Sequence, residues 1–219
     1  MHYVGDLMQE IEELSIGGSA KFKGPVKFRI ISIGGSIRIE GDAEGDELSI
    51  SGSGSIEGDL RVKELSVSGS IKVAKNIVGD KIGISGSASI SGELKGVEIE
   101  VSGSLKTSKI HAKIVHLAGS VKTEEIVAEQ VYIGKRSKVF GTIIGRKIKV
   151  DKEAEVKVII GDEVKIGKKV EAELIEGRII IVEKDAEIEE VRYIEKAEID
   201  ERAEVGKLTK IEKLSREIP

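Results

Sequence analysis

Apolar and polar residues alternate in short runs along the whole chain, and the runs recur in groups. In residues 68–84, apolar residues two apart occur at Ile71 and Val73 and again at Ile82 and Ile84, with a further apolar run between them. Residues two apart on a strand share one face of a sheet, so each run predicts a short strand with one buried side. Helical spacing does not persist through any group, which argues against a helical repeat.

A turn of small residues precedes each group, and successive turns lie 16 or 17 residues apart. The turns in the N-terminal half are Gly17-Gly18-Ser19, Gly34-Gly35-Ser36, Ser51-Gly52-Ser53, Ser68-Gly69-Ser70, Ser85-Gly86-Ser87, Ser102-Gly103-Ser104 and Ala118-Gly119-Ser120. Such regular spacing indicates one small unit that is copied and stacked, which is a solenoid. At these corners we expect Gly to supply positive φ and Ser to bond to nearby backbone.

The pattern predicts an all-β fold, a parallel β-helix of about 12 rungs of 16–17 residues, with three short strands per rung. Each strand then pairs with its copy one rung away, about 4.8 Å along the axis. The repeat continues after the serine-rich turns stop, because residues 186–196 align without gaps on residues 203–213. We therefore expect a single β-helix domain over residues 14–216.

The ends of such a stack carry strand edges that recruit other strands unless they are covered. Residues 1–13 are expected to form either an N-terminal cap, as a short amphipathic helix, or an irregular first rung. At the other end the repeat runs almost to Pro219, so little chain remains for a cap. The candidate self-association residues are Leu7, Met8, Ile11 and Leu14 at the N-terminal end and Leu208, Ile211, Leu214 and Ile218 at the C-terminal end.

The two halves of the repeat differ in surface chemistry. The outward column of the third strand in the first half is small and smooth: Ser15, Ser32, Ser49, Ser66 and Gly83. The turn column in the second half alternates in sign: Arg136, Glu153, Lys169, Asp185 and Arg202. Opposite charges on neighbouring rungs attract, so this column predicts a ladder of ion pairs. An ordinary solvated surface is the alternative interpretation.

Composition excludes several classes of function. The formal net charge is -4, and acidic and basic residues are intermixed, so we expect no nucleic-acid partner. There is no cysteine, and the first residues lack the pattern of a signal peptide, so we expect a cytoplasmic protein. Abundant Lys, Glu and Ile with scarce Asn and Gln are typical of a thermophile.

Candidate catalytic and metal-binding residues are few. His111 and His116 have no second ligand at metal spacing, so both are interpreted as surface residues. Aspartates that follow glycine are best explained by turn formation rather than by calcium binding: Asp6, Asp42, Asp59, Asp80 and Asp162. The sequence contains no phosphate-binding loop and no nucleophile elbow. We therefore expect no enzyme activity, no cofactor and no metal.

The repeating unit has the form turn, I/V-x-I/V, Gly-Asp, L/I and a closing L-x-I/V, over roughly residues 14–214. Examples are Ile37 to Ile50, with Gly41-Asp42, and Ser53 to Val67, with Gly58-Asp59. In this pattern the chain resembles the bactofilin family of polymer-forming cytoskeletal proteins. The resemblance implies a right-handed parallel β-helix, in agreement with the general handedness of parallel crossovers. It also implies end-to-end assembly into non-polar filaments without a nucleotide.

Bactofilins typically carry Pro-rich tails, and some carry a membrane-targeting segment. This chain has only Pro25 and Pro219 and almost no residues outside the repeat, so membrane attachment is not expected. The first functional hypothesis is a structural protein that associates with itself, through its terminal rungs, into filaments or oligomers. The alternative is a non-polymerising scaffold that binds another protein through its Ser-rich or charged face.

Overall fold

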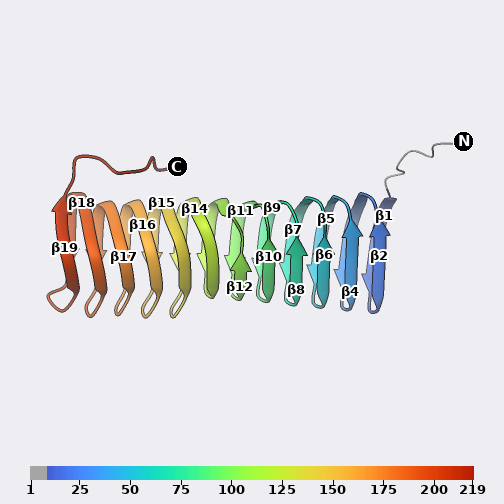
Figure 1. Ribbon diagram of the computed structural model, residues 1–219, viewed down its shortest axis with the longest axis horizontal. Helices are drawn as coiled ribbons and strands as arrows, with labels where there is room; N and C mark the ends of the chain where they lie inside the picture. The colour runs from blue at the N-terminus through green and yellow to red at the C-terminus, as the bar shows by residue number, and fades with distance from the viewer. Residues whose placement is uncertain (1–8) are drawn as a thin grey trace, which may run out of the picture. The chain divides into compact units, whose positions relative to one another are not determined.

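The computed structural model describes residues 9–219, and every regular element in that range is a β-strand. The strands belong to two compact units, one formed by residues up to 97 with 104–108 and the other by residues 98–103 with 109–219. Each unit is a parallel β-solenoid, and together they comprise about 12 turns. The expected all-β, parallel solenoid is therefore confirmed (Figure 1).

Two strands form each turn of unit 1, one short and one of about eight residues. They are β1 (Gln9–Ile16), β2 (Ser19–Lys23), β3 (Val26–Ile33), β4 (Ser36–Glu40), β5 (Ala43–Ile50), β6 (Ser53–Ile56), β7 (Leu60–Val67), β8 (Ser70–Val73), β9 (Ile77–Ile84), β10 (Ser87–Ile90) and β12 (Ser104–Lys106). β11 (Glu93–Val101) includes residues of both units. Long strands pair with long strands one turn later, and short strands pair with short strands.

Nearly every turn of unit 2 is a single long strand. The strands are β13 (Lys109–Leu117), β14 (Ser120–Ile133), β15 (Lys138–Val150), β16 (Glu155–Ile166), β17 (Glu171–Val182), β18 (Glu187–Ile199) and β19 (Glu204–Lys210). Each pairs in parallel with the next. The three segments expected per rung are thus joined at their corners. Backbone pairing between neighbouring turns continues around most corners. At a corner one residue is left out of the pairing, as between Val127-Ala128 and Gln130.

The N-terminal helix expected as one alternative is wrong for residues 9–16. These residues form strand β1, in which Ile11 lies opposite Phe28 and Leu14 opposite Ile31. A corner separates Ile11 from Leu14 and shifts the inward phase by one residue, which produces a three-residue spacing that imitates a helix. Leu7 and Met8 lie outside the described residues.

The core consists of inward columns of aliphatic side chains. In unit 1 one column contains Ile31, Leu48, Leu65 and Ile82, each no more than 1% exposed. Burial of one such side chain stabilises the fold by about 1.5–3 kcal/mol. Because the same column recurs in each turn, one alternation of apolar and polar residues specifies the whole interior.

The small-residue turns require glycine because successive turns lie so close together. A Cβ atom built on Gly69 would lie 2.0 Å from the carbonyl oxygen of Gly52, and one on Gly86 would lie 1.9 Å from that of Gly69. The expected reason, positive φ, is wrong at these corners. Among the glycines of the described chain, only Gly24 and Gly141 have φ in the left-handed region.

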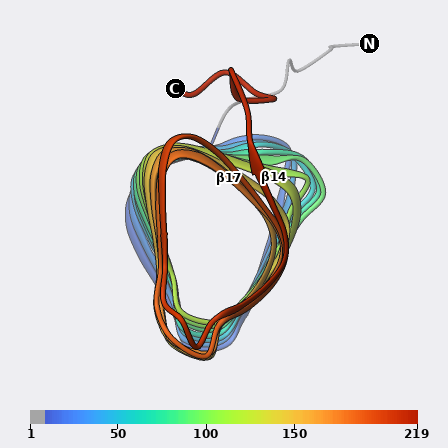
Figure 2. The ribbon, with the colours of Figure 1, turned by 90° about the vertical axis from the view of Figure 1, so that its left-hand side faces the viewer.

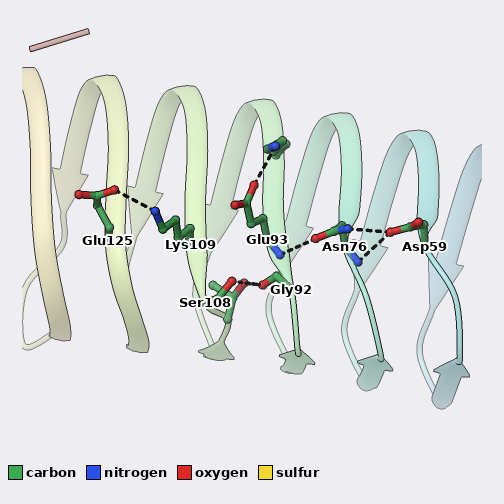
Figure 3. Close-up of polar contacts among 9 residues, drawn as sticks. Asp59, Asn76, Gly92, Glu93, Ser108, Lys109 and Glu125 are labelled. Atoms are coloured by element: carbon green, nitrogen blue, oxygen red, sulfur yellow. Dashed lines mark hydrogen bonds and ion pairs between the residues drawn. The ribbon is translucent and has the colours of Figure 1, made fainter.

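A polar row connects neighbouring turns of unit 1 at another corner (Figure 3). The Asp42 carboxylate accepts a hydrogen bond from the backbone N–H of Asp59 at 2.8 Å. Asp59 in turn accepts from Asn76, through both its backbone N–H at 3.1 Å and its side-chain amide at 2.9 Å. The amide oxygen of Asn76 accepts from the backbone N–H of Glu93. Hydrogen bonds from Asn76 also lower the pKa of Asp59.

The aspartates that follow glycine therefore have different environments. Asp42 and Asp59 lie at corners, as the turn interpretation expects, and each also bonds to the next turn. Asp80 and Asp162 instead lie within strands β9 and β16. Asp6 lies outside the described residues.

Candidate functional site

The last turn of unit 2 leaves part of the hydrophobic core uncovered. Strand β19 pairs with β18, and within the described chain no further strand pairs with its other edge. Val191 is fully buried at 0% exposure, whereas Leu208, its register partner in β19, is 52% exposed. Val205 is half-buried although its partner Ile188 is buried. An open strand edge beside uncovered apolar side chains is a template for pairing with another chain.

The C-terminal part of β18 presents a second open edge on the same turn. Ala197 and Ile199 pair with Ile180 and Val182 of β17. Both residues of β17 are buried, while Ala197 and Ile199 are only half-buried. The chain leaves the coil after Lys210, so in the described structure no strand continues beside this part of β18.

Charged side chains fasten the last turn to the one before it. Glu190 of β18 accepts a hydrogen bond from Arg192 at 2.9 Å, and its other carboxylate oxygen lies 3.0 Å from Nζ of Lys207 in β19. These two interactions lower the pKa of Glu190 to about 2. The hydrogen bond from Arg192 to Glu190 also raises the pKa of the guanidinium. Backbone pairing and this ionic cluster both join the exposed turn to the one before it.

The residues after β19 form a segment, here called the strap (residues 211–219), that runs back along unit 2. The backbone N–H of Ile211 donates to the carbonyl of Tyr193 at 2.8 Å. The N–H of Ser215 donates to the Glu176 carboxylate, and Arg146 donates to the carbonyl of Pro219 at 2.8 Å. Figures 1 and 2 show the strap outside the coil, beside the turns of this unit.

The strap covers an outward-facing apolar column. Ile144 and Ile160 follow the inward-facing Ile143 and Ile159, so their side chains point away from the core, yet they are only 4% and 3% exposed. Glu176 continues this column in β17 and is 1% exposed. The strap is hydrogen-bonded to Glu176 and to Arg146, which flank these isoleucines, and we infer that it is the segment that shields them from water. Glu176 also lies 3.8 Å from Arg192, which compensates its buried charge.

The first described turn of unit 1 has the same kind of open edge. β1 pairs with β3 and β2 pairs with β4, and within residues 9–219 neither has a partner on its other side. Ile11 and Leu14 are half-buried, whereas their partners one turn later, Phe28 and Ile31, are buried.

The described residues expected to mediate self-association are therefore divided among the last turn, the first described turn and the strap. Leu208 lies on the exposed last turn, and Ile11 and Leu14 lie on the first described turn. Ile211 begins the strap, and Leu214 and Ile218 are half-buried within it, away from the open edge of β19. Residues 211–219 lie along the side of unit 2 and do not pair with the open edge of β19.

Sequence reasoning missed the column beneath the strap. The available signal was the adjacent apolar pairs Ile143-Ile144 and Ile159-Ile160, which break the alternation expected of a strand with one solvated face.

Some of the outward residues singled out in the sequence form pairs within unit 2. The rings of His116 and Tyr132 stack with centroids 4.8 Å apart and planes inclined by 10°. Arg136 forms an ion pair with Glu153 at 2.7 Å, and Arg202 forms one with Asp185 at 2.7 Å. The alternating column thus forms pairs at its two ends.

The first four residues of this turn column also adopt an unusual backbone conformation. The φ angles of Arg136, Glu153, Lys169 and Asp185 are 58°, 59°, 56° and 61°, in the left-handed region that non-glycine residues rarely adopt. Each turn of this part of unit 2 therefore carries local strain at the same corner.

The described residues include no candidate metal-binding cluster and no membrane-spanning helix. No group of three or more His, Asp or Glu side chains among the described residues is placed to hold a metal ion. Residues 9–219 contain no helix long and apolar enough to cross a membrane. Comparison of the chain with protein-family models, curated proteins and solved structures finds no match.

Proposed function

We propose that this is a structural protein that associates with itself through its terminal turns, forming filaments or oligomers by end-to-end stacking. The observation that carries the proposal is the exposed Leu208, which continues a buried core column beside the open edges of β18 and β19. Each internal turn of unit 2 buries the same column by stacking, so a second copy placed there would complete the arrangement.

The first described turn of unit 1 supports the same function. Ile11 and Leu14 are only half-buried beside the open edges of β1 and β2. Assembly through such edges relies on backbone hydrogen bonds and apolar burial, so it needs no nucleotide. The resemblance to bactofilins points to the same kind of assembly. A cytoplasmic location and a non-enzymatic role complete the proposal, on the composition and the lack of catalytic motifs in the sequence.

Electron microscopy and light scattering of the full chain over a range of concentrations test the proposal. We expect assemblies that grow with concentration without added nucleotide. Leu208→Glu should shorten or abolish them, because it places a charge where a core column would continue. Val78→Glu is the matched control, since Val78 is also an exposed apolar residue, at 40%, but lies on the side of unit 1. Monodisperse monomers at every concentration would refute the proposal.

A further inference from the structure

One outward face of unit 2 combines exposed apolar groups with lysines around a shallow hollow of about 430 Å³. We call it the lysine face and define it by Tyr132, Lys147, Lys149, Lys165, Ile179 and Ile181. Glu163 also lines the hollow and is ion-paired with Lys147 at 3.6 Å, so Lys149 and Lys165 carry the face's positive charge. Tyr132 and Ile181 are 38% and 37% exposed, although both lie in regular strands. Apolar groups at a hollow, surrounded by a few charged groups, are typical of a docking surface.

The lysines occupy fixed positions in this face. Tyr132, Lys149, Lys165 and Ile181 are successive register partners on β14, β15, β16 and β17, so two ammonium groups stand between two apolar groups. Lys165 has a loose ion pair with Glu183 at 3.5 Å. Lys149 has no ion-pair partner within the described part of the chain, so its charge is available to a carboxylate from outside.

Unit 1 presents a face of complementary chemistry at the equivalent strand positions. We call it the serine face, formed by the column Ser32, Ser49, Ser66 and Gly83 together with Glu47 and Glu64. Its small side chains allow another sheet to approach closely. Glu47 and Glu64 are exposed register partners on neighbouring turns, and no ion pair to either is formed among residues 9–219. Lys81 follows Glu64 in the same column, so the acidic part of the face is limited to the turns of Glu47 and Glu64.

We propose that the serine face of one copy docks on the lysine face of a second copy, so that the protein also associates side by side. Glu47 and Glu64 would pair with Lys149 and Lys165, and the partner would cover Tyr132 and Ile181. Both faces repeat at the strand spacing of about 4.8 Å, so two neighbouring carboxylates can meet two neighbouring ammonium groups simultaneously. This contact uses no residue of the terminal turns and therefore goes beyond end-to-end stacking.

Charge reversal provides the test, in a Leu208→Glu background that blocks stacking at the last turn. Lys149→Glu/Lys165→Glu gives a chain with two acidic faces, and Glu47→Lys/Glu64→Lys gives one with two basic faces. We expect each to self-associate at least about tenfold more weakly than the parent in sedimentation velocity at low salt. An equimolar mixture of the two should associate again, as should a single chain that carries all four reversals.

Two controls separate this contact from general charge effects and from failed folding. Lys152→Glu/Lys168→Glu makes the same change in net charge at exposed turn positions off the lysine face, and should leave association unchanged. Circular dichroism should show the same melting transition for all variants. Added salt should weaken association of the parent.

The outcomes also distinguish the two proposals. A Leu208→Glu parent that stays monomeric at all concentrations, or a mixture that does not associate, would overturn lateral docking, whatever the filaments of the unaltered chain show. Capture of an acidic partner protein by the lysine face without self-association would overturn it as well. If the Leu208→Glu variant forms the same assemblies as the unaltered chain and lateral association persists, end stacking alone is overturned.

Discussion

Leu208 lies one turn beyond Val191 in the same inward column, and the two residues differ from 52% to 0% in exposure. Because the neighbours of Val191 are all in place, Val191→Ala should lower the free energy of unfolding by about 2 kcal/mol. Leu208→Ala should cost less than about 1 kcal/mol in the monomer, since much of that side chain is already in water.

In the associated protein this difference should shrink, because stacking would bury Leu208. Chemical denaturation at low and high protein concentration measures both costs. A cost for Leu208→Ala that is independent of concentration would contradict burial of this residue in the assembly.

Gly69→Ala should destabilise unit 1 by about 2 kcal/mol or more, because the added methyl carbon would lie 2.0 Å from the backbone oxygen of Gly52 and force the turns apart. Gly83→Ala is the matched control, since the nearest atom to its added Cβ is 3.8 Å away. Equilibrium unfolding in denaturant compares the two variants. Equal effects would mean that the contact between turns is not what requires glycine at position 69.

Lys169→Gly should stabilise unit 2 by about 1 kcal/mol, because glycine adopts the left-handed conformation without the steric cost that Lys169 bears at a φ of 56°. Thermal unfolding followed by circular dichroism provides the measurement. Lys168→Gly serves as control, since Lys168 is exposed on the same turn but is not in the left-handed region, and it should give no gain.

The acid sensitivity of the last turn should depend on Glu190. Its pKa is lowered from 4.5 to about 2, so its ionic contacts contribute fully above pH 4.5 and are lost as the pH falls from 4.5 towards 2. Glu190→Gln should reduce the loss of stability across this window, while lowering stability at neutral pH. Melting temperatures measured at pH 6, 4 and 2.5 show the difference between the two curves. An equal fall in melting temperature in the two proteins would show that other groups cause the acid sensitivity.

Ser215→Pro should release the strap, because proline removes the N–H that Ser215 donates to the buried Glu176 carboxylate. Leaving that carboxylate without this donor should cost about 1–3 kcal/mol of strap docking. Trypsin should then cut faster at Lys213 and Arg216. Ser215→Ala keeps the N–H and should be cut at the rate of the unaltered chain. Equal cleavage rates for the unaltered chain and both variants would show that this bond does not hold the strap.

The sequence was sufficient to predict the repeating turn of the solenoid, but not the strap that lies outside the coil. Columns such as Leu48, Leu65 and Ile82 could be predicted because a period of two within a period of 17 specifies an inward face directly. The spacing of Ile11 and Leu14 misled because a corner shifts the phase of a strand by one residue. The strap has no periodicity of its own, and its contact with Glu176 links residues far apart in the sequence.

Reasoning from the glycine residue alone also predicted the wrong cause for the glycine turns. Conformational freedom is a property of one residue, whereas the distance from Gly69 to Gly52 exists only after two turns have stacked. The open end at Leu208 could be inferred because a repeat that stops must leave its last copy with one neighbour, and this holds whatever the details of that turn are.

The strap also constrains the number of turns between β15 and β18. It bonds to β18 at Tyr193, to β17 at Glu176 and to β15 at Arg146, so its three contacts together span a set number of turns. Gain of one turn between β15 and β18 would displace Arg146 from Pro219 by about 4.8 Å and break that bond. In the described part of unit 1 no segment spans the turns in this way. Whole turns could therefore be gained or lost in unit 1 during evolution, whereas the contacts of the strap fix the number of turns between β15 and β18.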